Sequence, residues 1–341
     1  MKKILIPAGI LFIAISACSR KSVPSSSSKG RIEQLKKERE LATQSGDNAT
    51  PAAKSKHKKS KHQPSLSPTN EALNNDVAIK KTRDSTLYFD SSYSNYVYET
   101  LAQAYADTIA MSPENNDPSL DYAKGFVGTT NFNMRKPNFV IIHHTSQNSV
   151  DETLHTFTLE RTGVSAHYLI GKDGSIHHLV NDYLRAWQAG AGKWGNITDM
   201  NSCSVGIELD NDGYAPFTDK QINSLLVVLE SLKKRFGIPQ ANFIGHEDWA
   251  PVRKNDPNVN FPWAILAAKG FGNWWSDTTN VQVPIDFNST QALRIIGYDI
   301  RDLGRTVIAF RRHFCGVEST DTALSPAEIK VLYCLYTKYM Y

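Results

Sequence analysis

The sequence lacks a long apolar run, an internal repeat and a strong net charge. The apolar stretch at residues 4–15 is too short to span a bilayer comfortably. The formal net charge of +4 is small, and nearly all of the excess lies in an N-terminal tail. Because this basic tail has no accompanying fold for base readout, we expect no nucleic-acid partner. The helical HExxH arrangement is also absent, which argues against a zinc protease of that kind.

What is present is sufficient for a folded protein. The chain has 341 residues, enough for one medium domain, a smaller one and some unfolded connection. A hydrophobic fraction of 40% and a charged fraction of 21% are ordinary for a globular protein. Most of the chain is therefore expected to fold.

Residues 1–18 are expected to be a targeting signal. Lys2 and Lys3 precede the apolar stretch, and small residues lead from its end to Cys18. The arrangement looks like a bacterial lipoprotein signal, in which Cys18 becomes the lipidated first residue of the mature protein. An ordinary secretory signal with a chance cysteine is the alternative. Several acyl chains on one residue would anchor firmly, since each buried methylene contributes about 0.8 kcal/mol.

Three cysteines remain once Cys18 is assigned to the anchor. In an oxidising compartment Cys315 and Cys334 could form a disulfide, which would leave Cys203 as a small buried apolar side chain. The sequence alone does not establish this pairing.

Residues 19–83 are expected to form a disordered tether that is basic and rich in serine. They contain a serine run at residues 25–28 and a block of like charges, KSKHKKSKH, at residues 54–62. Such a composition cannot bury enough apolar surface to offset its conformational entropy. A flexible chain of this length has a root-mean-square span of about 40 to 50 Å.

An α/β domain is expected at residues 138–275, after an N-terminal extension at residues 84–137 with a helical candidate at residues 96–110. The apolar, β-branched run at residues 139–142 is typical of a strand that is covered on both faces. Further strands are expected at residues 166–170, 175–180, 205–209 and 242–245, and helices at residues 149–161 and 218–236. The pattern predicts a mixed central sheet flanked by helices.

Residues 283–341 are expected to form a small all-α domain of three helices. The helical segments are predicted at residues 289–296, 303–314 and 325–339. In the last of them Ser325 is the expected cap, Pro326 takes the first helical position and Glu328 completes a capping box.

Some residues at the predicted strand ends have the chemistry of a metal-dependent hydrolase. Such an enzyme needs three protein ligands, an open position for water, a carboxylate that handles protons and a cation or donor for the developing oxyanion. His143 ends the first strand and His246 ends the last. Asp256 follows in a loop, and Glu208 lies on a strand between them. The spacing alone is a weak signal, because these residues are far apart in the sequence.

Six local segments carry a more specific signal. They are FVIIHHTS (139–146), SAHYLIGKDG (165–174), AWQAG (186–190), SVGIELDN (204–211), IGHEDWAP (244–251) and RKNDPNVNFPW (253–263). In this order they resemble the N-acetylmuramoyl-L-alanine amidase family of zinc enzymes, zinc amidase type 2, whose fold is shared by peptidoglycan-recognition proteins. Membrane-anchored members of the family look similar in carrying a small helical C-terminal domain. The resemblance implies a peptidoglycan-binding role for residues 283–341, and a domain that only packs against the first is the alternative.

The resemblance also implies the roles of individual residues. It implies a zinc ion bound by His143, His246 and Asp256. It further implies that Glu208 is the general base and that Lys254 is the cation that stabilises the oxyanion. Bound zinc would lower the pKa of its water toward about 7 and so supply hydroxide at neutral pH.

The resemblance says less about the roles of the residues that neighbour these ligands. His143 and His144 point to opposite faces of a strand, so only one can be a ligand, and the resemblance selects His143. This chain has Gln188 where the family usually has histidine, and glutamine cannot carry a proton at neutral pH. Gln188, Trp187 and His167 are candidate substrate contacts. For His167 a hydrogen-bonded core position is the favoured interpretation.

Taken together, the resemblance implies an amidase that cuts the amide bond between N-acetylmuramic acid and L-alanine in peptidoglycan or muropeptides. We expect a monomer that is exported, anchored through Cys18, and located at the outer membrane facing the periplasm. The alternative is a non-catalytic peptidoglycan receptor on the same fold. Such a receptor would be expected to have lost a zinc ligand or the base, and this chain has lost neither.

Overall fold

The computed structural model describes residues 91–111, 129–131 and 133–340. The expected signal, the tether and most of the N-terminal extension lie outside these residues. Within the described residues, no helix combines the length and the apolar character needed to cross a bilayer. The helix expected at residues 96–110 is present as α2 (Ser91–Ile109), and none of its residues is buried. Contacts divide the chain into two units, and residues 133–340 belong to one of them.

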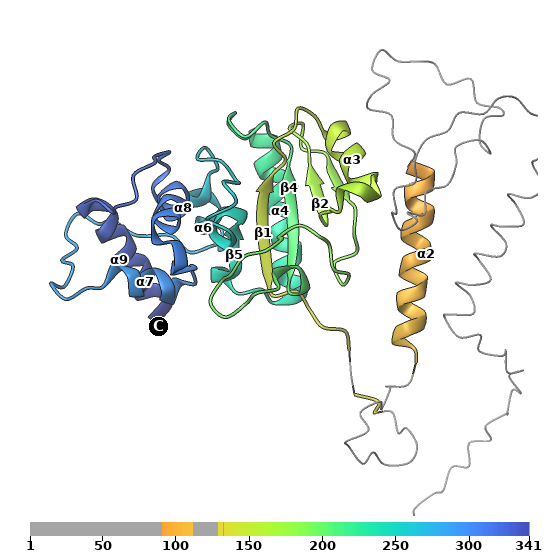
Figure 1. The fold of residues 1–341 in the computed structure, drawn as a ribbon, viewed down its shortest axis with the longest axis horizontal. Coiled ribbons are helices and arrows are strands. Elements are labelled where there is room, and N and C mark those ends of the chain that lie inside the picture. The colour runs from red at the N-terminus through yellow and green to blue at the C-terminus, as the bar shows by residue number, and fades with distance from the viewer. Residues whose placement is uncertain (1–90, 112–128, 132, 341) are drawn as a thin grey trace, which may run out of the picture. The chain divides into compact units, whose positions relative to one another are not determined.

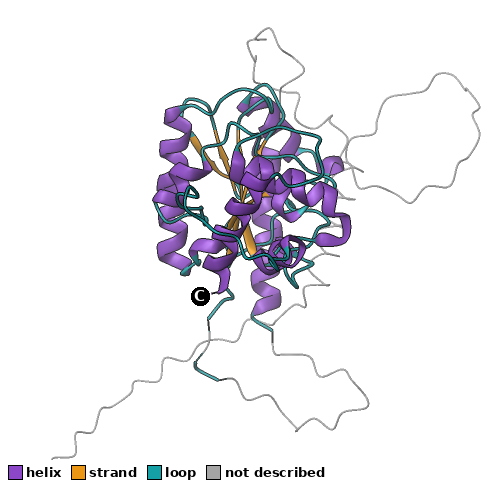
Figure 2. Cartoon of the chain, turned by 90° about the vertical axis from the view of Figure 1, so that its left-hand side faces the viewer, coloured by secondary structure: helices purple, strands orange, loops and turns teal. Residues whose placement is uncertain are grey.

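The centre of this unit is a five-stranded sheet in the order β3-β2-β4-β1-β5. Its strands are β1 (Phe139–His144), β2 (Tyr168–Ile170), β3 (Ile176–His178), β4 (Ser204–Leu209) and β5 (Phe243–Gly245). Strands β2, β4, β1 and β5 run parallel, and β3 pairs with β2 in the antiparallel direction. Helices flank the strands (Figure 2). The predicted mixed α/β sheet is confirmed.

Strand β1 is buried along its whole length, as its apolar sequence predicts. Because successive side chains on a strand point to opposite faces, it contributes to both hydrophobic clusters of the unit. Val140 and Ile142 pack in the cluster that contains helix α4. Phe139 and Ile141 pack in the cluster that contains the C-terminal helices. The strand that carries His143 is therefore fixed from both sides.

Helix α4 begins and ends where the sequence signals predict, whereas helix α3 begins as predicted but ends early. Helix α4 (Asp219–Phe236) is capped by the Thr218 side chain and ends at Gly237, whose φ of 70° suits glycine. Helix α3 (Val150–Thr158) is capped by Ser149 and is shorter than expected. Leu159 has extended backbone angles, and a separate turn of 3₁₀ helix follows at Glu160–Thr162.

Two short helices were not predicted. Helix α5 (His246–Trp249) directly follows β5, and helix α6 (Trp263–Ala268) lies further along the chain. Four and six residues are too few to show helical periodicity, which needs a longer window. His246 is therefore the first residue of a helix rather than the last residue of a strand.

The three C-terminal helices are confirmed within one or two residues of their expected bounds. They are α7 (Ser289–Ile296), α8 (Leu303–Cys315) and α9 (Pro326–Met340), drawn in blue in Figure 1. Their buried side chains share one hydrophobic cluster with Ile141 and Ile244 of the sheet and Trp249 of α5. The helices thus pack on the α/β region through a common core. Cys203, Cys315 and Cys334 are all free thiols.

Candidate metal centre

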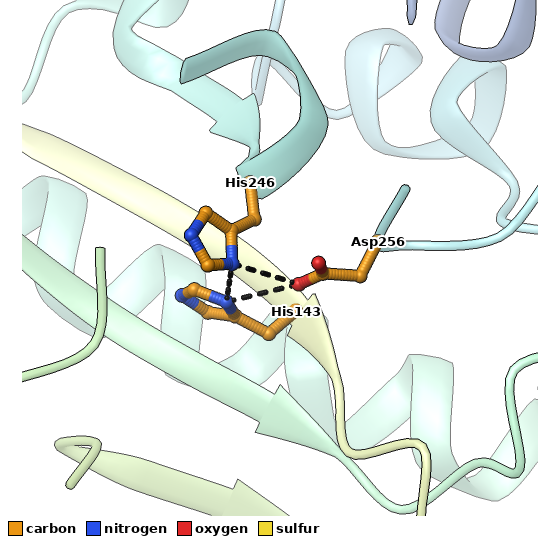
Figure 3. Close-up of side chains that lie close together, drawn as sticks. All are labelled: His143, His246 and Asp256. Atoms are coloured by element: carbon orange, nitrogen blue, oxygen red, sulfur yellow. Dashed lines mark hydrogen bonds and ion pairs between the residues drawn. The ribbon is translucent and has the colours of Figure 1, made fainter. Parts of the chain in front are cut away.

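Three ligand atoms converge at one edge of the sheet (Figure 3). His143 Nδ1 lies 2.9 Å from His246 Nδ1. Asp256 Oδ2 lies 3.1 Å from each of these two nitrogens. All three residues are buried. The structure therefore brings together the three residues that the sequence analysis selected as zinc ligands.

Parallel strands place two of these residues side by side. His143 is the penultimate residue of β1, and His246 follows directly after β5, which pairs with β1. The carboxyl ends of adjacent parallel strands meet at the same edge, where α/β proteins commonly bind ligands. Asp256 comes from the loop after α5, and its carbonyl oxygen accepts a hydrogen bond of 2.8 Å from the backbone N–H of Glu247. The loop is thereby attached to α5.

The second nitrogen of each histidine faces an acceptor on one short segment. His246 Nε2 lies 2.8 Å from the main-chain oxygen of Ala189. His143 Nε2 lies 2.6 Å from Oε1 of Gln188. The segment is held in turn by Asn201, whose Oδ1 accepts hydrogen bonds from the backbone N–H groups of Gln188 and Ala189. Both imidazole rings are thus oriented by two consecutive residues.

These contacts determine which ring nitrogen carries the proton. A main-chain carbonyl only accepts, so Nε2 of His246 must be the N–H. The amide orientation of Gln188 follows from Ser204, whose hydroxyl donates to the carbonyl of Met200 at 2.6 Å and accepts from Gln188 Nε2 at 2.8 Å. Oε1 of Gln188 therefore accepts from Nε2 of His143. In the neutral rings both Nδ1 atoms are left with a lone pair directed at the centre.

The result is a group of acceptors that suits a cation. Two unprotonated nitrogens and a carboxylate oxygen lie within 3.1 Å of one another with no donor between them. Zinc favours such nitrogen and oxygen ligands, and tetrahedral bonds of about 2.0–2.2 Å separate ligand atoms by roughly 3.3–3.6 Å. The donor set fits zinc with a small outward adjustment.

Glu208 lies beside this group. It pairs with His143 in the register of β4 and β1, and its Oε1 lies 4.0 Å from His143 Nδ1. The other carboxylate oxygen is buried without a hydrogen-bond partner. Burial raises the pKa of Glu208 to about 7, and Asp256 adds to this effect, while His143 and Lys254 oppose it. A carboxyl group with a pKa near neutrality and a free oxygen can accept a proton from a nearby water.

Lys254 and His144 lie on the periphery of the centre. Lys254 is half-buried on the loop before Asp256, close enough for its charge to lower the pKa of Glu208. His144 points away from His143 and approaches Gly213, where a Cβ would lie 3.2 Å from its Nε2. Burial lowers the pKa of His144. The structure thus separates the adjacent histidines as expected for a strand.

The structure places two of the three candidate substrate contacts, His167 and Gln188, against groups of the protein. His167 is completely buried, and its ring nitrogens bond to the backbone of Leu184 and Gly206, which makes it a core residue. Both ends of the Gln188 amide are used by protein groups, so its place is behind His143 rather than against a substrate. Trp187 is 57% exposed and stays a candidate contact.

Several groups that support the ligands were not predicted from the sequence. The carbonyl of Ala189 is a backbone group, for which a sequence carries no signal. Ser204 and Asn201 act on Gln188 across the chain, although Ser204 opens one of the motifs singled out above. Gly206 also has a role, because a Cβ there would lie 2.5 Å from Cγ of Gln188. Only glycine leaves room for the side chain that orients His143.

The fold and the site together define an α/β protein with a buried His, His, Asp group that could hold a metal ion. Comparisons with known proteins agree with this class. Residues 133–259 match the family described as N-acetylmuramoyl-L-alanine amidase. The N-acetylmuramoyl-L-alanine amidase AmiD of Escherichia coli is 34% identical over 208 residues, which are 51% of this chain and 74% of AmiD. The chain belongs to the N-acetylmuramoyl-L-alanine amidase family, and it is an enzyme of that class.

Solved structures extend the likeness to the C-terminal helices. The complex of AmiD from E. coli with the substrate anhydro-N-acetylmuramic acid-L-Ala-D-gamma-Glu-L-Lys has a TM-score of 0.55 at 27% identity, covering 62% of this chain and 93% of AmiD. AMPDH3 from Pseudomonas aeruginosa, in complex with anhydromuramic pentapeptide, has a TM-score of 0.54 at 27% identity, covering 65% of this chain and 99% of AMPDH3.

Proposed function

We propose that this protein is a zinc-dependent amidase that hydrolyses the bond between N-acetylmuramic acid and L-alanine in peptidoglycan or its muropeptide fragments. The observation that carries the proposal is the convergence of His143 Nδ1, His246 Nδ1 and Asp256 Oδ2 without a donor among them. Membership of the amidase family supports the choice of bond. The muropeptide ligands of AmiD and AMPDH3 support the choice of substrate class.

The roles of the chain's own residues follow from the geometry. Zinc, when bound, supplies a Lewis acid and lowers the pKa of a water toward about 7. Glu208 takes a proton from the attacking water and delivers it to the leaving amine of L-alanine. Lys254 offers a positive charge to the oxygen of the carbonyl that is attacked.

Gln188 and Ala189 keep the two histidines in the tautomer that leaves Nδ1 free. Hydrogen bonds of this kind orient a ligand and raise its basicity. Trp187, next to them and exposed, is the residue we assign to contact with the substrate. In this segment, Gln188 and Ala189 thus orient the metal ligands, and Trp187 contacts the substrate.

We also propose that the enzyme is exported and anchored by lipid on Cys18, as a monomer at the outer membrane that faces the periplasm. The apolar stretch followed by small residues and a cysteine supports this location. A tether of residues 19–83 would let the catalytic unit reach wall polymer at a distance of about 40 to 50 Å.

Mass spectrometry of purified muropeptides, incubated with the full-length protein, tests the proposed activity. We expect release of free stem peptide that begins with L-alanine, its loss after treatment with a zinc chelator, and its return when zinc is added. Anhydro-muropeptides and intact wall should be compared in the same series. Intact muropeptides that nevertheless bind the protein would contradict the proposal and favour the non-catalytic receptor.

A further inference from the structure

The C-terminal helices contact the residues that directly follow His246. The side chains of Glu247 and Asp248 in α5 are completely buried. Arg312 of α8 donates from Nη1 to Oε2 of Glu247 at 2.6 Å. His313, next to it on α8, has Nδ1 2.7 Å from Oδ2 of Asp248. Two consecutive residues of α8 thus bind two consecutive residues of α5.

Further contacts fix the same four-residue helix. The hydroxyl of Tyr298, after α7, donates to Oδ1 of Asp248. Oδ2 of Asp248 also accepts a bond of 2.7 Å from the backbone N–H of Gly245, the residue before His246. The ring of His313 stacks on Trp263 with a centroid distance of 3.9 Å. The helices therefore hold the backbone on both sides of His246.

Movement of α5 would disturb more than one metal ligand. The backbone N–H of Glu247 donates to the carbonyl of Asp256. The indole of Trp249 donates to the carbonyl of Ala189, the same oxygen that faces His246 Nε2. A shift of α5 changes the position of His246 directly and that of Asp256 through its backbone.

We propose that the C-terminal helices are a positioning element of the metal centre. Through Arg312, His313 and Tyr298 they fix α5, and so fix His246 Nδ1 relative to the other two ligand atoms. This role is separate from any binding of peptidoglycan by these helices. It rests on the proposed function, because it takes His246 to be a zinc ligand.

Arg311 provides a matched control for Arg312. The side chains of the two adjacent arginines are similarly buried, at 4% and 8% exposed, and each forms a salt bridge. Arg311 pairs with Glu328 of α9, within the C-terminal helices, whereas Arg312 pairs with Glu247 of α5. Loss of either arginine removes a buried ion pair, but only the loss of Arg312 removes a contact with α5. Arg312 also pairs with the exposed Glu318, and Arg311 also donates to the carbonyls of Asp321 and Ala323.

Zinc affinity separates a positioning role from a purely stabilising one. We propose to measure the dissociation constant of zinc in the full-length protein by competition with a chromophoric chelator, and the visible spectrum of the Co²⁺ form. Arg312→Gln is expected to weaken zinc binding about 10- to 100-fold and to change the Co²⁺ spectrum. Arg311→Gln is expected to lower the melting temperature while zinc affinity stays within about twofold of wild type.

Tyr298→Phe gives a milder test, because it removes one hydroxyl and keeps the ring. We expect it to weaken zinc binding about tenfold, while Tyr336→Phe, an aromatic change within the same helices, leaves the affinity unchanged. Wild-type affinity and spectrum in both Arg312→Gln and Tyr298→Phe would overturn the inference. If Arg312→Gln does not fold, Tyr298→Phe alone decides. A wild-type protein that binds no zinc would instead contradict the proposed function.

Discussion

Two groups of buried polar side chains lie on either side of α5. They differ in how many of their hydrogen-bond acceptors find a donor within the protein. In the metal centre, two nitrogens and a carboxylate oxygen face one another with no donor among them. At the contact with the C-terminal helices, Arg312 matches Glu247, while His313 and Tyr298 match Asp248. The first group consists of acceptors alone and suits a cation. In the second group donors of the chain bind acceptors of the chain, although Oε1 of Glu247 and Nε2 of His313 are buried without a partner.

The difference shows that the four-residue helix α5 contributes both to the metal centre and to the packing of the C-terminal helices. His246 faces the metal centre, and the two residues after it face the C-terminal helices. Buried acceptors that lack donors cost free energy unless something binds them, whereas a matched buried pair costs free energy only when it is broken. Substitutions in the metal centre should therefore show first in activity and zinc binding, whereas substitutions at the contact with the C-terminal helices should lower the unfolding free energy as well as zinc affinity.

The largest effect is expected for catalysis at Glu208. Glu208→Gln keeps the shape of the side chain but cannot accept a proton, so we expect kcat to fall about 10²- to 10⁴-fold while zinc stays bound. Initial rates on purified muropeptides and zinc content measured together test this expectation. Glu230→Gln, an exposed change on α4, should leave both unchanged. Near wild-type turnover in Glu208→Gln would remove Glu208 from the mechanism.

The next effect concerns the other side of α5. Asp248→Ala leaves His313, Tyr298 and a backbone N–H without their acceptor, so we expect the zinc-free protein to lose about 3–5 kcal/mol of unfolding free energy. Urea denaturation followed by circular dichroism measures this loss. Asp286→Ala, at an exposed position, should stay within about 0.5 kcal/mol of wild type.

The same substitution in the metal centre sharpens the comparison. Asp256→Ala removes one of three mutually facing acceptors, so in zinc-free protein it should destabilise the fold less than Asp248→Ala does. Equal losses of unfolding free energy at the two positions would show that the two groups do not differ in the way described.

A third prediction concerns pH. Burial raises the pKa of Glu208 from its ordinary value of 4.5 to about 7, so the folded zinc-free protein holds this proton more tightly than the unfolded chain. The resulting stability is fully present below pH 4.5 and is lost as the pH rises through about 7, with an upper value of about 3 kcal/mol. Glu208→Gln has no such proton, so its unfolding free energy relative to wild type should increase with pH. A difference that is constant between pH 4.5 and 8 would contradict the shift.

The smallest effect is expected at Gln188. Gln188→Ala removes the acceptor for His143 Nε2, and we expect zinc affinity to fall about tenfold, or about 1.4 kcal/mol. Trp187→Ala, one residue earlier, should leave zinc affinity unchanged and raise KM for muropeptides. Chelator competition and steady-state kinetics on both variants measure the two effects. If Gln188→Ala raised KM without changing zinc affinity, and Trp187→Ala weakened zinc binding, Gln188 would contact the substrate and Trp187 would support the metal ligands.

The sequence predicted the elements whose signals are local and long enough to be read. The starts of α3 and α4 and the apolar run of β1 lie where predicted, because helix caps and apolar runs depend on neighbouring residues. Helix α5 escaped prediction because four residues have no periodicity of their own. Its conformation depends on tertiary contacts, such as those that Asp248 makes with Tyr298 and His313, which lie 50 and 65 residues later in the sequence.

Within the site, residue type was easier to predict than residue role. The motifs selected His143, His246, Asp256 and Glu208, and the structure brings all four side chains together. Gln188 was assigned to the substrate, yet its contacts with His143 and Ser204 appear only when three segments of the chain meet. His313 has a partner in Asp248 that its position on a helix did not indicate.

The carbonyl of Ala189 has a consequence for how the enzyme can vary. This oxygen faces the ring of His246 and accepts from the indole of Trp249 and the guanidinium of Arg253. No side-chain exchange removes a main-chain carbonyl, so substitutions around position 189 leave this acceptor in place. Insertion or deletion of a single residue there would shift the carbonyl away from all three groups at once. The segment should therefore tolerate changes of composition far better than changes of length.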